Sequence, residues 1–381
     1  MLVPFVVIYC HYLMMPLLRL PVNKNWEFKQ QTTLNNHTAK DFLPVAQFPT
    51  VAHIDLLQHG LIKDPYIDTN ELDSLWVNDA DFTYKTTLPS INNNPETTKI
   101  YLIFDGLDTI VTVFLNGEKI LESTNMHISH RIDITSHIKS SSSTDHVLEL
   151  KFKNAPEYAK SQMKRIGYRG DPKKISFGGP ERLFVRKAQY HWGWDWGPAL
   201  NTSGPWKDVW LETFEENKGR IEEFVVRQQV AEDLKSAVLY VSGTIDGGAE
   251  NVVIQLTNPD QSKLLEKTVA VQNGVFKSDV KIENPELWFP FTYGGQPLYT
   301  VRAVIPDQHE EVRKIGFRRL RLLQHPLKAQ EGTSFLFEIN NIRTFLGGSC
   351  WIPADYLLPR ITRKTYYDWV LLAKSGNQAS K

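Results

Sequence analysis

The sequence is poor in cysteine and has no excess of charge. Only Cys10 and Cys350 occur in 381 residues, which excludes a disulfide scaffold and a cysteine zinc motif and suits a reducing compartment. Lys and Arg (43) balance Asp and Glu (43) without a long basic run, which argues against a nucleic-acid partner. No serine or cysteine lies in a nucleophile elbow, so we expect structural roles for the isolated histidines His53 and His191.

The N-terminal segment from Met1 to Leu20 is the longest apolar run. It is interrupted by His11, Pro4 and Pro16, and it lacks a basic start and an Ala-x-Ala cleavage site. It therefore makes a poor signal peptide and is too broken for a membrane span. We expect residues 1–21 to be a leader of undetermined role, and the protein to be cytoplasmic with no membrane partner; secretion is the alternative.

The rest of the chain reads as mainly β. Aromatic residues (11%), 22 Gly and 21 Pro suit twisted sheets joined by many turns. Over residues 22–215, β-branched runs alternate with turns such as Asn116-Gly117, a type I′ hairpin signal, and predict a jelly-roll β-sandwich. Over residues 216–323, closely spaced short strands predict an immunoglobulin-like β-sandwich. The strands predicted there are Ile221 to Val230, Ser236 to Ser242, Asn251 to Leu256, Thr268 to Val275 and Leu298 to Ile305.

The stretch from Ala188 to Pro198, AQYHWGWDWGP, surrounds one carboxylate with three tryptophans. A sugar ring has an apolar C–H face and a polar rim, so flat aromatic walls and a hydrogen-bond acceptor suit it. Tryptophans in an all-β domain more often fill the core. The carboxylate weakens that interpretation, because an ionised group among indoles is costly unless it is paired or meets a ligand. Trp194, Asp195 and Trp196 are therefore the candidate substrate-binding residues.

The sequence does not decide the backbone conformation of this stretch. On a strand, Trp192, Trp194 and Trp196 would share one face and Asp195 the other. A turn at either flanking glycine would instead aim indoles and carboxylate into one pocket. The basic run from Arg182 to Lys187 precedes it, and we expect that run to anchor the loop through carboxylates rather than to bind phosphate.

The tryptophan-rich stretch resembles the Trp-Asp-Trp segment of the β-mannosidases, which belong with β-galactosidase and β-glucuronidase in one glycoside hydrolase family. The resemblance is to intracellular fungal-type enzymes. It implies retaining hydrolysis of terminal β-D-mannose at the non-reducing ends of manno-oligosaccharides, with no metal and no cofactor; it leaves a homodimer open for the complete enzyme. Four further segments carry it: Thr50 to Tyr84, Tyr101 to Gly117, Gly204 to Glu212 and Gly347 to Pro359.

The resemblance also implies that residues 324–381 are the truncated start of a (β/α)8 barrel. Strands are predicted at Ser334 to Ile339 and Ile342 to Phe345, and Thr362 caps a helix that ends at Gly376. One strand, a loop and one helix cannot close a parallel barrel. We therefore expect the apolar face of this helix to be partly uncovered; its residues are Tyr366, Trp369, Val370 and Ala373.

No catalytic residue can be assigned in this chain. In the family both catalytic glutamates lie in the barrel beyond the segment matched by Trp351, and Asn70-Glu71 lies in the first domain, so it is not the acid/base dipeptide. Trp351 and Asp355 lie at the mouth of the first barrel strand and receive no role. The sequence predicts a truncated β-mannosidase that is inactive alone; the alternative is a non-catalytic carbohydrate-binding or scaffolding module.

Overall fold

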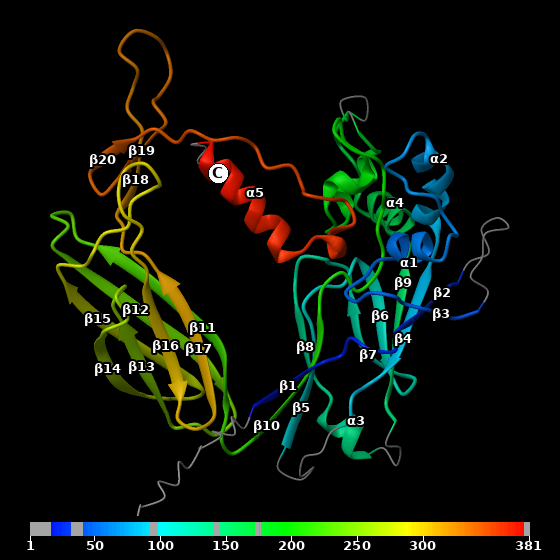
Figure 1. The fold of residues 1–381 in the computed structure, drawn as a ribbon, viewed down its shortest axis with the longest axis horizontal. Coiled ribbons are helices and arrows are strands. Elements are labelled where there is room, and N and C mark those ends of the chain that lie inside the picture. The colour runs from blue at the N-terminus through cyan, green and yellow to red at the C-terminus, as the bar shows by residue number, and fades with distance from the viewer. Residues whose placement is uncertain are drawn as a thin grey trace, which may run out of the picture.

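The computed structural model describes residues 17–31, 41–90, 98–140, 145–171, 175 and 177–376. Two β-sandwiches lie side by side, and a C-terminal segment with a small third sheet connects them (Figure 1). The mainly β fold class is confirmed. Most of the predicted leader, with Cys10, lies outside the described residues.

The first sandwich packs a four-stranded sheet against a six-stranded sheet. The four-stranded sheet runs in the order β1 (Leu18–Pro21), β10 (Val209–Glu215), β5 (Thr98–Phe104) and β8 (His130–Asp133). The six-stranded sheet runs β3 (Leu43–Pro44), β2 (Glu27–Gln30), β4 (Phe82–Thr87), β9 (Val147–Lys153), β6 (Ile110–Leu115) and β7 (Glu118–Ser123). β1 falls within the segment predicted as a leader, and it pairs with β10.

The core of the first sandwich comes from the inward faces of both sheets. Phe28 and Phe82 from the larger sheet and Phe104 and Leu211 from the smaller one are fully buried. β6 alternates buried and half-buried residues, as expected for a strand with one face in the core. The turn that follows it has positive φ at Asn116 (52°) and Gly117 (84°), which confirms the type I′ hairpin.

Three helices, α1, α2 and α4, lie together at one end of the first sandwich, the upper right of Figure 1, and α3 lies at the other end. The Asn154 side chain accepts a hydrogen bond from the Glu157 amide and so caps α4. The helical segments are α1 (Ala52–Gln58), α2 (Asn70–Ser74), η1 (Leu75–Asp79), α3 (Thr135–Ser140), α4 (Ala155–Ile166), η3 (Pro180–Phe184) and η4 (Gln189–Trp192).

The second sandwich has its own core, built from residues between Ile221 and Phe317. One sheet runs β11 (Arg220–Val230), β12 (Ser236–Asp246), β15 (Val275–Glu283). The other runs β14 (Lys263–Ala270), β13 (Asn251–Thr257), β16 (Tyr299–Ile305), β17 (His309–Ile315).

The strand predicted from Thr268 to Val275 is wrong. Its β-branched residues suggested a single strand, but Gln272 and Val275 exchange backbone hydrogen bonds around a turn between β14 and β15. Asn273 (φ 51°) and Gly274 (φ 73°) form that turn, because these residue types tolerate the left-handed conformation.

The C-terminal segment begins with a three-stranded antiparallel sheet: β18 (Leu320–Leu323), β19 (Leu336–Ile339) and β20 (Ile342–Thr344). The chain then crosses to the first sandwich, forms η5 (Leu358–Arg360), and returns through α5 (Arg363–Ser375), which lies between the two sandwiches (Figure 1). The Thr362 side chain accepts from the Thr365 amide, which confirms the predicted cap. These strands pair antiparallel, so the start of a parallel barrel stays a prediction.

Charged residues join the two sandwiches directly. Arg131 of β8 donates to Asp246 of β12 at 3.0 Å, and its Nε lies 3.5 Å from Glu212 Oε1. Arg220 of β11 places its Nε 2.6 Å from the same Glu212 oxygen. The Glu212 side chain is only 2% exposed, so this contact is a partly buried ion network that fixes one sandwich against the other.

Candidate functional site

Residues 188–200, named the tryptophan loop below, contain η4 followed by a tight turn rather than a strand. After η4 the backbone reverses at Gly193, whose φ is 89°. The Trp194 amide donates to the Gly197 carbonyl at 3.1 Å, and the Gly197 amide donates to the Trp194 carbonyl at 3.3 Å. Asp195 and Trp196 are the two residues at the tip. The strand alternative is wrong, and the turn alternative is right about the backbone; a single pocket that receives both indoles and the carboxylate stays a prediction.

The first two tryptophans of the loop have different environments. Trp192 is 8% exposed and packs in a small core with Ala159 and its neighbours. Trp194 is 36% exposed, stacks on Phe177 with ring centroids 5.3 Å apart, and has the Arg182 guanidinium 5.1 Å from its ring centroid. Trp192 is therefore a core residue, whereas Trp194 is a supported aromatic ring that still faces solvent.

Asp195 lies at the exposed tip of the turn. Among the described residues, no donor or cation pairs with its carboxylate. The predicted cost of an ion enclosed by indoles does not arise, because water reaches this group. Both oxygens of Asp195 are consequently available to accept hydrogen bonds from a ligand.

Trp196 is partly buried and faces the C-terminal segment. Its ring centroid lies 6.0 Å from that of Tyr190 and 5.6 Å from that of Tyr356. The three predicted site residues are adjacent, but their environments differ: Trp194 and Asp195 face outward, and Trp196 packs mainly against protein.

A buried ion pair closes the base of the tryptophan loop. Lys187 Nζ lies 2.5 and 2.7 Å from the two carboxylate oxygens of Asp108, and it donates to the Thr202 carbonyl at 2.7 Å. The Lys187 and Asp108 side chains are 0% and 1% exposed. Burial lowers the pKa of Lys187, and the Asp108 charge opposes that shift. Lys187 thus anchors the loop through a carboxylate, as predicted, whereas Arg182 at the other end of the basic run stacks on an indole.

The two isolated histidines are buried beside this ion pair. Burial, and then the Lys187 charge, lowers the pKa of His53 to about 3. The same two causes, in the same order, hold the pKa of His191 well below its usual value. Both rings are therefore neutral near pH 7, which fits the structural roles expected for them rather than acid/base chemistry.

The C-terminal segment packs directly onto the tryptophan loop. Tyr356 is 4% exposed and belongs to a small core with Leu200 and Leu357. A Cβ added at Gly197 would lie 2.4 Å from the Tyr356 hydroxyl oxygen, so this close approach requires glycine. Burial raises the pKa of Tyr356 to about 12, with further contributions from the charges of Glu71 and Asp195. The turn and the C-terminal segment thus form one packed unit.

Asp355 anchors that segment to the first sandwich. The Tyr66 hydroxyl donates to Asp355 Oδ1 at 2.6 Å and accepts from the Tyr356 amide at 3.1 Å. Arg360 donates to both Asp355 oxygens through Nε and Nη2, and its guanidinium lies 4.9 Å from the Tyr66 ring centroid. This group is named the Tyr66 cluster. Asp355, for which sequence gave no role, is a structural anchor here.

The remaining aromatic candidate lies on an exposed apolar surface. Trp351 is 48% exposed, with ring centroids 6.3 Å from Tyr366 and 6.0 Å from Trp369 of α5. No α5 residue is buried, and Leu372 is 71% exposed. A hollow of about 440 Å³ lies between Trp351 and the helix. The predicted uncovered face is confirmed for the part of the chain that the structure describes.

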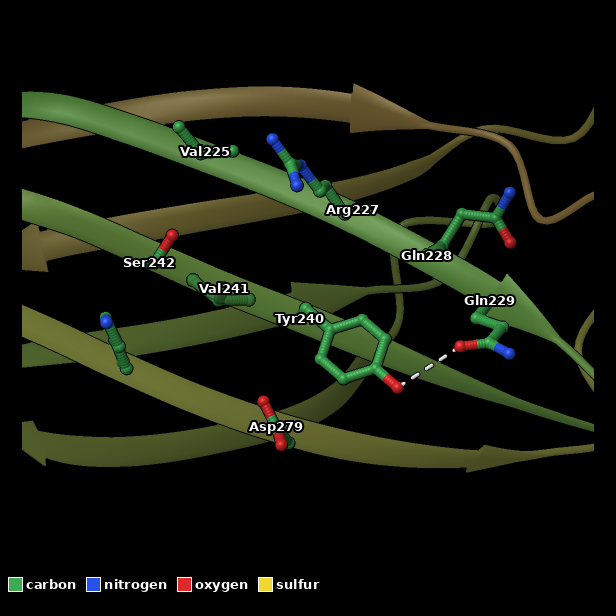
Figure 2. Close-up of a pocket in the computed structure, with 9 residues that line it drawn as sticks. Val225, Arg227, Gln228, Gln229, Tyr240, Val241, Ser242 and Asp279 are labelled. Carbon is green, nitrogen blue, oxygen red and sulfur yellow. Dashed lines mark hydrogen bonds between the residues drawn. The ribbon is translucent and has the colours of Figure 1, made fainter.

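A second, more polar hollow of about 740 Å³ lies on the outer face of the β11-β12-β15 sheet (Figure 2). Arg227, Tyr240 and Asp279 stand in one row across these three strands. The Tyr240 hydroxyl donates to Gln229 at 3.3 Å. This face is open and lies on the second sandwich, away from the tryptophan loop of the first.

Neither a metal centre nor a membrane helix is found in the described ranges. They contain no group of three or more His, Cys, Asp and Glu side chains placed to hold a metal ion. No described helix is both long enough and apolar enough to cross a membrane.

Comparisons with known proteins agree on one family. The model of the glycosyl hydrolase 2 galactose-binding domain-like family matches residues 26–207, and that of glycosyl hydrolases family 2 matches residues 219–318. A beta-mannosidase B of Thermothelomyces thermophilus is 42% identical over 373 residues, covering 96% of this chain and 42% of that protein. One of Neosartorya fischeri is 39% identical over 376 residues, covering 96% of this chain and 42% of that protein.

Solved structures give the same picture. A beta-D-mannosidase from Dictyoglomus thermophilum superposes with a TM-score of 0.80 and 32% identity, covering 93% of this chain and 43% of that one. A beta-glucuronidase from Parabacteroides merdae, at 18% identity and a TM-score of 0.63, covers 93% of this chain and 41% of that one and shows a shared fold only. The chain thus spans well under half the length of these relatives.

Proposed function

Because the chain belongs to glycosyl hydrolase family 2, we propose that residues 1–381 supply part of the substrate-binding wall of a β-mannosidase. That enzyme removes terminal β-D-mannose from non-reducing ends with retention of configuration. The observation that carries the proposal is the turn that presents Trp194 and Asp195 to solvent. Identity of about 40% to proteins named beta-mannosidase B supports mannose as the sugar.

The geometry of the turn suits a pyranose ring. Phe177 and Arg182 hold the Trp194 indole in place, and its 36% exposed surface is what could meet the C–H face of a sugar. Asp195 follows directly, and its two oxygens can accept from two neighbouring hydroxyl groups. Each hydrogen bond to a charged acceptor contributes about 1.5 to 3 kcal/mol. One aromatic wall and one acceptor orient a sugar but enclose little of it.

Retaining hydrolysis needs two carboxyl groups about 5 to 5.5 Å apart, on either side of the scissile bond. Two carboxylates near the loop are already committed: Asp108 pairs with Lys187, and Asp355 pairs with Arg360. Glu71 is the other carboxylate whose charge acts on Tyr356, but it lies in the first domain, and the family resemblance gives neither Glu71 nor Asp195 a catalytic role. We therefore assign no catalytic residue within residues 1–381, and this polypeptide alone should not cleave aryl β-mannosides.

The test is turnover and binding by the purified 381-residue chain. With p-nitrophenyl β-D-mannoside we expect release no faster than in a buffer blank. Release that further purification removes would identify a contaminating hydrolase; release that copurifies with the chain, whether or not it depends on Asp195, would contradict the assignment. Methyl β-D-mannoside should bind only in the millimolar range, about 4 kcal/mol or less. Micromolar binding would favour the alternative of a dedicated carbohydrate-binding module.

A further inference from the structure

Tyr356 contacts the tryptophan loop on several sides although it lies far along the chain. Its ring packs edge-on against Tyr190 at 5.3 Å and against Trp196 at 5.6 Å. Its hydroxyl end lies so close to Gly197 that a Cβ there would meet it at 2.4 Å. Gly197, on which the turn closes, and Trp196, which follows Asp195, thus both contact the Tyr356 ring.

The position of that ring is not set by its own hydroxyl group. The Tyr356 hydroxyl oxygen is buried and has no hydrogen-bond partner in the described part of the chain. The backbone of the same residue, in contrast, is held: its amide donates to the Tyr66 hydroxyl at 3.1 Å, and the next amide, of Leu357, donates to Asp355 at 2.8 Å. The Tyr66 cluster therefore holds the backbone from which the ring projects.

We propose that Tyr66 and Asp355 are positioning residues for the sugar site, because they hold Tyr356 against the tryptophan loop. The identity of the sugar rests on the proposed function. The contact from the Tyr66 cluster through Tyr356 to the tryptophan loop does not depend on it. Tyr66 comes from the first sandwich and Asp355 from the C-terminal segment, so their hydrogen bond at 2.6 Å closes a contact between residues 289 positions apart. When it opens, Tyr356 can move away from Trp196, and the turn that carries Asp195 is held less firmly.

Within the Tyr66 cluster, Asp355 is held by two partners, Tyr66 and Arg360, whereas the Tyr356 amide is held by the Tyr66 hydroxyl. Arg360 holds both Asp355 oxygens, so the carboxylate stays in place when Tyr66 is changed. The Tyr66 hydroxyl is the one described group that joins both Asp355 and the Tyr356 amide to the first sandwich. Tyr66→Phe removes that oxygen and keeps the ring on which Arg360 lies. This variant therefore separates positioning from packing.

The experiment is amide hydrogen exchange of the 381-residue chain, read by mass spectrometry in peptides that cover residues 190–198. We expect Tyr66→Phe to accelerate exchange there about tenfold or more, as loss of a hydrogen bond to a charged group predicts. Exchange in β5 and β10 should not change. Tyr240→Phe is the matched control, because it removes a tyrosine hydroxyl with one hydrogen bond on the second sandwich. Asp355→Asn should act in the same direction as Tyr66→Phe.

A second measurement tests whether the contact between the Tyr66 cluster and Tyr356 affects mannoside binding. The saturation-transfer NMR signal of methyl β-D-mannoside should fall in Tyr66→Phe and stay unchanged in Tyr240→Phe. Unaltered exchange over residues 190–198 in both Tyr66→Phe and Asp355→Asn would overturn the proposal. If the unsubstituted chain gives no mannoside signal while Tyr66→Phe still accelerates exchange, the mannose assignment fails and the positioning contact stands.

Discussion

Replacing Lys187 by methionine should strongly destabilise the first sandwich. Methionine keeps the length of the side chain and removes the ammonium group, which leaves the Asp108 carboxylate at 1% exposure with the hydroxyl groups of Thr109 and Thr202 as its remaining donors. It also removes the donor to the Thr202 carbonyl at the base of the tryptophan loop.

The size of the effect follows from burial. Removing one partner of a buried ion pair costs about 3 to 5 kcal/mol, because the other charge stays uncompensated. A domain of this size loses about 2 to 4 °C for each kcal/mol, so the melting temperature of the first sandwich should fall by roughly 6 to 20 °C. Lys119→Met is the control: its ion pair with Glu122 is also within hydrogen-bond distance, at 3.0 Å, but the side chains are 56% and 63% exposed. Exposed pairs contribute about 0 to 1 kcal/mol.

Urea unfolding followed by tryptophan fluorescence suits this comparison, since most of the ten tryptophans precede the second sandwich. The double variant Asp108→Asn/Lys187→Met should lose less than the two single changes together, because neither charge is left unpaired. A Lys187→Met chain within about 1 kcal/mol of Lys119→Met would refute the reasoning that the loop is closed by a buried charge.

Three other predictions concern Gly197, the buried histidines and α5. Gly197→Ala should lower the free energy of unfolding by about 1 to 3 kcal/mol through its clash with Tyr356, and Tyr356→Ala in the same chain should relieve that clash. Gly295→Ala is the control, because the nearest contact of its added Cβ is 3.7 Å. Equal unfolding free energies for the two alanine variants would contradict the clash. His53, with a pKa of about 3 in the fold, takes up its proton first in the unfolded chain, so stability is lost as pH falls below about 6.5. Asp55, whose pKa burial raises to about 7, acts in the opposite direction, so the readout is the difference in unfolding free energy between the unsubstituted chain and His53→Leu at pH 7 and at pH 5. That difference should shift in favour of His53→Leu at pH 5; an equal difference at both pH values would exclude His53. Leu372→Lys on α5 should reduce self-association in light scattering more than Leu264→Lys, at 71% against 41% exposure; equal effects would show that the α5 face is not the cause.

The parts of the fold that sequence predicted are those with a strong local pattern. β6 is a run of mostly β-branched and aromatic residues, and Asn116-Gly117 and Thr362 carry turn and cap chemistry that acts within a few residues. β17 was missed because its sequence, HEEVRKI, is charged and its burial pattern has no fully buried residue. A pattern of that kind gives no period-2 signal to read.

The sequence named candidate site residues, but it did not show how the fold holds them. Trp194 and Asp195 stand out locally, because indoles around one carboxylate are chemically unusual. The contacts of Tyr66 with Asp355 and of Gly197 with Tyr356 join residues far apart in sequence, and neither motif carries a local signal for its partner. The exposure of Asp195 also has no local signal, because it depends on a turn that the sequence did not distinguish from a strand.

The most direct test of the proposed function is a titration of the 381-residue chain with methyl β-D-mannoside, followed by ligand-observed NMR. The account predicts millimolar binding that Asp195→Asn weakens about tenfold or more, since that change removes the charge from its hydrogen bonds. Asp279→Asn, an exposed carboxylate on the second sandwich, should leave the affinity unchanged. Equal affinities for the unsubstituted chain and Asp195→Asn would contradict the assignment of the tryptophan loop as the sugar-binding wall.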